Sequence, residues 1–220
     1  MDYQKLRRAT ELFREDEVAY DFAWVEAKKI DWQNLYDLPV EEVKEKVIRF
    51  LNRWKCRLPC SDELAERIKK THRQLVPLLG ALEGETLEDM DFEKMRSLGD
   101  EKLKNSDIIR RIFDKTSDMG TYGYRPVPAS KLLHMINPKL FVMWDNNIGR
   151  EYVPKLDGDH YAYEFLPRMQ QEANEAIETF MKDMGLDRIA AIKEIENRYG
   201  RTLAKLVDEY NYIKHTRLIK

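Results

Sequence analysis

Two side chains in the second half of the chain, Lys131 and Asp145, have types and positions that could carry chemistry, and they lie 14 residues apart. Lys131 stands near the start of a short apolar helix, where the positive end of the helix dipole favours loss of its ammonium proton. A neutral lysine amine can act as a nucleophile. Asp145 precedes a predicted helix over residues 146–152, so its carboxylate is expected to cap that helix. The pattern leaves open whether Asp145 has a chemical role beyond capping.

Prolines and apolar runs are expected to position these two side chains. Pro126 and Pro128 make the approach rigid, and Pro128 fits the first turn of the helix because its missing N–H needs no partner there. Asn137 precedes Pro138, which should end the helix. The apolar run over 140–144 should then cross the interior and deliver Asp145 at its end.

The segment over about residues 122–152 resembles the catalytic segment of the helix-hairpin-helix DNA glycosylases, the superfamily of endonuclease III and 8-oxoguanine glycosylase. The likeness consists of a lysine at the front of an apolar helix, a turn, an apolar run, and D-x-x-I at the start of another helix. Two features differ from the family pattern. Residues 125–130 read Arg-Pro-Val-Pro-Ala-Ser in place of a glycine-rich hairpin, and the lysine-to-aspartate separation is several residues shorter than usual.

This resemblance implies an all-α, two-lobed fold and removal of a damaged base from duplex DNA. Lys131 would be the nucleophile that attacks the sugar C1′, and Asp145 would stabilise positive charge and assist proton transfer. The resulting Schiff base could support strand cleavage. The expected nucleic-acid contacts are Tyr122, Arg125, Ser130, Lys139, Asn146 and Arg150.

The remaining polar and aromatic groups of the segment have simpler interpretations. Tyr122, Tyr124 or Trp144 could stack on a base, but an aromatic ring inside an apolar run, such as Trp144, is normally a core residue. His134 is expected on the helix surface or as a hydrogen-bonded core histidine rather than as an acid or a ligand.

Composition limits the class of protein. The chain has 220 residues, 43% apolar and 35% charged, with few Gly and Pro, a mixture typical of amphipathic helices. Its formal charge of −2 excludes a globally basic nucleic-acid binder, although residues 125–155 hold five Lys or Arg against two Asp or Glu. Cys56 and Cys60 make neither a disulfide framework nor a zinc site. We expect a cytoplasmic monomer without metal, cofactor or membrane segment.

Apolar spacing predicts a single all-α domain over 1–220 with about eight to eleven helices, no strands and no repeat. Lobes are expected over 1–82 with the C-terminal helices, and over 95–155. An acidic loop with a short helix over 83–93 is the candidate hinge between them. The predicted helices cover 3–29 with a kink near 14–17, 40–54, 61–80, 106–119, 161–184, 186–199 and 202–219.

Two other functions compete with base excision. One is a non-catalytic helical module that binds nucleic acid or protein and keeps only the fold. The other is a helical protein with an unrelated small-molecule site. Lys131 and Asp145 distinguish these functions, because only the glycosylase requires both side chains to face one cleft.

Overall fold

The computed structural model describes residues 1–217, and its fold is all-α with one small hairpin. The α-helices are α1 (Tyr3–Asp16), α2 (Val18–Ala27), α3 (Val40–Glu42), α4 (Arg49–Arg53), α5 (Asp62–Ala81), α6 (Asn105–Ser117), α7 (Pro126–Ile136), α8 (Asn146–Tyr152), α9 (Gly158–His160), α10 (Leu166–Met184), α11 (Arg188–Tyr199) and α12 (Leu203–Asn211). Shorter segments of 3₁₀ or π geometry are η1 (Leu35–Asp37), η2 (Val43–Ile48), η3 (Gly120–Tyr122), η4 (Tyr161–Phe165) and η5 (Tyr212–Arg217).

Local sequence signals account for most helix boundaries. Ser61 caps α5 by accepting the N–H of Leu64, as the sequence predicts. The predicted kink in the first helix is a break at Glu17, which separates α1 from α2. Gly185 ends α10 in the left-handed conformation that glycine adopts without strain.

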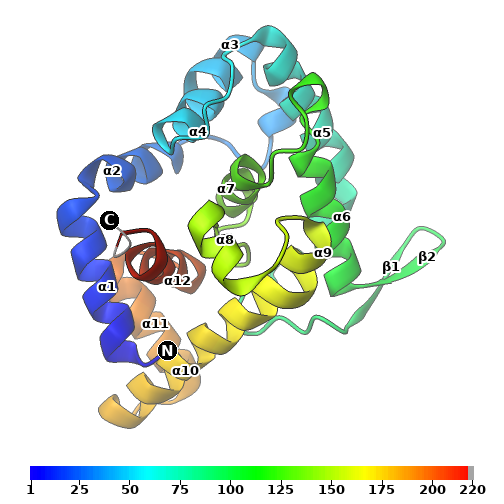
Figure 1. Ribbon diagram of the computed structural model, residues 1–220. Helices are drawn as coiled ribbons and strands as arrows, with labels where there is room; N and C mark the ends of the chain where they lie inside the picture. Colours follow the sequence, from blue (N-terminus) through cyan, green and yellow to red (C-terminus); the bar gives the residue numbers. More distant parts are fainter. Residues whose placement is uncertain (218–220) are drawn as a thin grey trace.

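Helix α7 lies in the interior, and other helices pack around it (Figure 1). Its residues from Pro128 to Ile136 are all buried. Helix α6 packs against α7, while α1 packs against α10 and α12, so the two ends of the chain share one side of the molecule. Most buried side chains form one large core, and a second, smaller core joins α1 to the C-terminal helices.

The prediction of no strands is wrong. Strands β1 (Met95–Leu98) and β2 (Glu101–Lys104) form an antiparallel hairpin in which Leu98 pairs with Glu101 across a Gly99-Asp100 turn. The hairpin projects away from the helices (Figure 1). Its strands carry many charged side chains, so their apolar alternation is weak, and the turn dipeptide is the signal that marks it.

Three further expectations need correction or restriction. Residues 83–93 contain turns and no helix. Helix α6 begins at Asn105, ahead of the predicted Ser106-Asp107 cap, because the Asp107 carboxylate reaches back to the N–H of Lys104. The predicted last helix is α12 with η5 as far as Arg217, and its continuation to Ile219 lies outside the described residues.

Within residues 1–217, none of the helices combines the length and the apolar character needed to cross a bilayer.

Candidate functional site

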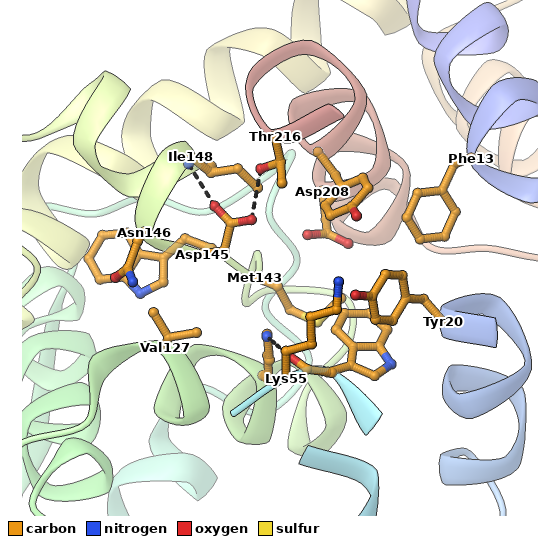
Figure 2. Close-up of a pocket in the computed structure, with 14 residues that line it drawn as sticks. Phe13, Tyr20, Lys55, Val127, Met143, Asp145, Asn146, Ile148, Asp208 and Thr216 are labelled. Atoms are coloured by element: carbon orange, nitrogen blue, oxygen red, sulfur yellow. Dashed lines mark hydrogen bonds between the residues drawn. The ribbon is translucent and has the colours of Figure 1, made fainter. Parts of the chain in front are cut away.

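A pocket of about 190 Å³ opens beside the amino-terminal half of α7, between helices that are far apart in the sequence (Figure 2). Both residues singled out by the sequence, Lys131 and Asp145, line it. The full lining is Phe13, Tyr20, Trp54, Lys55, Val127, Lys131, Met143, Trp144, Asp145, Asn146, Ile148, Asp208, Tyr212 and Thr216.

Lys131 enters the pocket from the middle of α7. Its side chain is buried, and its Nζ donates a hydrogen bond of 2.7 Å to the carbonyl oxygen of Trp54. The same nitrogen lies 3.7 Å from Sγ of Cys56. Burial raises the pKa of the Cys56 thiol, and the Lys131 ammonium opposes that rise.

The predicted position of Lys131 at the helix start is wrong. Helix α7 begins at Pro126, so Lys131 is its sixth residue. The helix dipole acts mainly within the first turn, so it does not explain a neutral amine here. The polar partners of Lys131 come instead from the chain that follows α4.

Asp145 caps α8, as the sequence predicts. Its Oδ1 accepts the N–H groups of Asn147 and Ile148, both at 2.8 Å. Its Oδ2 accepts the hydroxyl of Thr216, in η5, at 2.7 Å. Figure 2 shows the Asp145 carboxylate held between α8 and this C-terminal segment.

Ser130 explains how a short connection still brings Asp145 back to α7. Its hydroxyl is fully buried, lies 2.9 Å from the carbonyl oxygen of Val127, and contacts both the N–H and the carbonyl of Trp144 at 3.2 Å. The run over 140–144 is buried as predicted, and Trp144 packs in the core against Phe113 and Tyr161. The residue before Asp145 is therefore fixed to α7 by a side chain inside α7.

A second carboxylate, Asp208 of α12, lines the same pocket and belongs to a buried ionic cluster. Lys205 is fully buried, with its Nζ 2.8 Å from Oδ2 of Asp208 and 3.4 Å from Oε1 of Glu209. Arg201 approaches the same Glu209 oxygen at 3.1 Å. Burial raises the pKa of Asp208, and the positive charges of Lys205 and then Lys131 oppose the rise.

Aromatic rings form the wall opposite Asp145. Tyr20 meets Trp54 and Tyr212 edge to face, with ring centroids 5.9 and 6.0 Å apart, and Phe13 meets Tyr212 at 5.5 Å. Such a wall can accept a flat ring by stacking or by edge contact. These aromatic residues come from α1, α2, the end of α4 and η5. No local sequence motif therefore predicts that they line one pocket.

Lys55 lines the mouth of the pocket with an unusual backbone. Its φ of 61° is left-handed, and it occupies the position after the α4 C-cap where glycine is the usual residue. The N–H of Lys55 donates to Asn52 and that of Cys56 to Leu51, the paired bonds of a Schellman motif. Its Nζ lies 5.3 Å from the centroid of the Tyr20 ring. The basic residues that follow the 40–54 helix are the sequence signal for this part of the site.

The expected nucleic-acid contacts do not gather at one place. Asn146 lines the pocket, and Arg125 and Arg150 are exposed at the start of α7 and on α8. Tyr122 is hydrogen-bonded to Ser61 at 2.9 Å and is absent from the pocket lining. Lys139 lies beyond the opposite end of α7 and lines a separate depression. Ser130 is buried, so its hydroxyl is used inside the protein.

His134 is a hydrogen-bonded core histidine, one of its two expected roles. Its Nδ1 lies 2.7 Å from the carbonyl oxygen of Phe141, and its Nε2 accepts the indole N–H of Trp24 at 3.3 Å. Burial lowers its pKa to about 3, so the ring is neutral near pH 7. Within residues 1–217, no group of three or more His, Cys, Asp or Glu side chains is arranged to hold a metal ion.

Comparisons with protein-family models, with curated proteins and with solved structures found no match for this chain. We therefore infer its chemistry from the set of side chains that line the pocket. The pocket combines a buried amine, two carboxylates in different surroundings and an aromatic wall. These groups suit nucleophilic or acid–base chemistry on a flat, polar ligand.

Proposed function

We propose that this chain is a DNA glycosylase-like base-excision enzyme that uses Lys131 as nucleophile and the Asp145 carboxylate to stabilise the positive charge that develops on the sugar. The observation that carries the proposal is that Lys131 and Asp145, 14 residues apart, line the same pocket. The partner is duplex DNA with a damaged base, and the two free cysteines suit a cytoplasmic enzyme.

In this proposal the pocket lining would perform the reaction, and exposed cations on and outside the lining would hold the DNA. An extruded base would lie against Tyr20, Trp54 and Tyr212 while its sugar faces the Lys131 amine. The Asp145 carboxylate would lie beside the positive charge that develops on the sugar and stabilise it. Lys55, Arg125 and Arg150 are exposed cations that can hold phosphates.

Borohydride trapping tests the enzyme directly. We expect the wild-type chain to form a covalent adduct with at least one duplex from a panel of damaged bases, because reduction fixes a lysine Schiff base. Lys131→Gln should form none. Lys193→Gln is the matched control, since Lys193 is an exposed lysine on α11 outside the pocket, and its adduct yield should equal that of the wild type.

Asp145→Asn tests the carboxylate without removing the cap, because asparagine caps a helix as well as aspartate does. We expect base release to fall by about 10²-fold or more while the melting temperature stays close to that of the wild type. No adduct and no base release with any lesion would overturn the enzyme assignment.

A non-catalytic DNA-binding module is the second candidate, and one observation favours it. The Lys131 amine and both Asp145 oxygens already bond to protein atoms. Such a module would bind duplex DNA with an affinity that falls steeply as salt rises, because its contacts are to phosphate. It would form no adduct. Affinity that does not respond to salt would exclude this candidate.

A further inference from the structure

Asp208 differs from Asp145 in having an oxygen that accepts from no donor in the described part of the chain. Its Oδ2 accepts from Lys205 at 2.8 Å, and the structure records no hydrogen-bond donor for Oδ1 within residues 1–217. The side chain is 6% exposed, and Asp208 lines the pocket. A carboxylate oxygen that accepts from no donor among residues 1–217 and lies beside a pocket is available to a group inside that pocket.

Lys131 is a second cation near Asp208, and it lines the same pocket. Both residues line it, one from α7 and one from α12, and the charge of Lys131 acts on the Asp208 carboxylate. The other oxygen is held by Lys205, which is buried among aromatic rings with its Nζ 4.5 Å from the Phe13 centroid and 5.1 Å from that of Trp54. Lys205 therefore fixes Asp208 in place and leaves one oxygen for exchange.

We propose that Asp208 is a catalytic residue of this pocket, the base that takes a proton from the Lys131 ammonium and the acid that returns one to the departing base. This inference rests on the proposed function. Asp145 is poorly suited to the same task, since its oxygens already accept two N–H groups and a hydroxyl. A proton on Asp145 would disturb the cap of α8.

Protons and charge balance over the first step, in which the covalent adduct forms and the base leaves. A proton moves from the Lys131 ammonium to Asp208, which leaves a neutral amine and a neutral carboxylic acid. The amine nitrogen then forms a bond to C1′ of the sugar, and the bond from C1′ to the base nitrogen breaks with its electron pair on the base. The base takes the proton of Asp208, so the carboxylate is restored and the new C1′ ammonium carries the positive charge.

A duplex with a single abasic site separates amine activation from base release, because it can form the Schiff base without any base to expel. We expect Asp208→Asn to slow borohydride-trapped adduct formation on this duplex by about 10²-fold or more. Glu209→Gln is the matched control. Glu209 is the neighbouring buried acid, it also contacts Lys205, and it is absent from the pocket lining. Its rate should stay within about threefold of the wild type.

The pH profile gives a readout that a purely structural role would not move. Without Asp208 the Lys131 proton must leave to solvent, so the rate of Asp208→Asn should rise with pH and approach that of the wild type in alkaline buffer. The charged or titratable groups around Asp208 are Lys205 and Glu209 on α12, Lys131 on α7, Asp145 before α8, Tyr161 in η4, and Lys55, Tyr20 and Tyr212 on the pocket lining.

The outcomes separate the two proposals. A wild-type chain that forms adducts while Asp208→Asn forms them equally fast would overturn the role of Asp208 and leave the proposed function standing. Equal losses in Asp208→Asn and Glu209→Gln, with no recovery at high pH, would assign Asp208 to the fold alone. A wild-type chain without any adduct, on abasic or damaged duplexes, would overturn both proposals.

Discussion

Asp145 and Asp208 are two carboxylates on the lining of one pocket, and their surroundings are opposite. Asp145 is partly exposed and accepts two N–H groups at the start of α8 together with the Thr216 hydroxyl. Asp208 is buried, and its ion-pair partner is Lys205, which is itself out of contact with water. The Asp145 carboxylate stabilises the start of α8, whereas the Asp208 carboxylate destabilises the fold unless its ion-pair partner is present.

The difference shows which groups a fold keeps for its own stability. A capping aspartate is common because it satisfies donors that every helix start leaves open. A buried ion pair contributes little net stability compared with apolar side chains of the same volume. The buried cluster of Asp208, Lys205 and Glu209, of which Asp208 lines the pocket, is therefore a feature that folding alone does not require.

Removal of Lys205 should produce the largest effect on stability. Lys205→Met leaves Asp208 without its ion-pair partner in the interior, so we expect the free energy of unfolding to fall by about 3–5 kcal/mol. Urea unfolding at pH 7, followed by far-ultraviolet circular dichroism, measures this loss.

The double variant Lys205→Met with Asp208→Asn is the control for that measurement. It removes the uncompensated charge as well as the cation, so it should recover at least half of the loss. A single variant within about 1 kcal/mol of the wild type would mean that Asp208 is already neutral or solvated, and the contrast with Asp145 would disappear.

The sequence predicts the features that depend on neighbouring residues better than those that depend on tertiary packing. The all-α fold, the cap at Asp145 and the buried run over 140–144 depend on spacings and caps within a few residues, and they are visible in the sequence. The prediction that Lys131 lies at a helix start is wrong because Pro126, rather than Pro128, begins α7. The proline pair allows either boundary.

The rest of the pocket depends on tertiary packing, so the sequence alone does not predict it. Trp54, Tyr20 and Tyr212 meet only because α2, the end of α4 and η5 converge. Asp208 and Glu209 lie three and four residues after Lys205, among the apolar residues of α12. Charges at helical spacing on an apolar face were the available signal for the buried cluster.

Asp145 provides a smaller and more local test of the comparison. Asp145→Ala removes the α8 cap and the bond to Thr216, and we expect a loss of about 1–2 kcal/mol. Asp145→Asn should lose only a few tenths of that energy, because its side-chain oxygen can still accept the two N–H groups. Thermal unfolding of both variants, monitored by calorimetry, measures the difference. Equal losses would show that the charge of Asp145, and not its capping oxygen, stabilises α8.

Lys55 differs from the two carboxylates because its expected effect on stability comes from backbone strain and not from side-chain charge. Its effect on the free energy of unfolding should be the smallest of those predicted. Its left-handed φ of 61° disfavours any side chain, while glycine adopts this conformation freely. Lys55→Gly should therefore raise the free energy of unfolding by a few tenths of a kcal/mol, after allowance for the lost contact with the Tyr20 ring.

Lys55→Ala is the matched variant, since it loses the same contact and keeps the strain, and it should be less stable than Lys55→Gly by about 1 kcal/mol. Chemical denaturation of the three chains side by side measures both differences. If the glycine variant is more stable than the wild type yet binds duplex DNA as weakly as the alanine variant, the lysine is retained for binding at a cost to the fold. An alanine variant at least as stable as the glycine variant would show that the left-handed backbone at Lys55 does not destabilise the fold. Among the lining residues compared, Asp208 would then be the one whose role in chemistry lowers the stability of the protein.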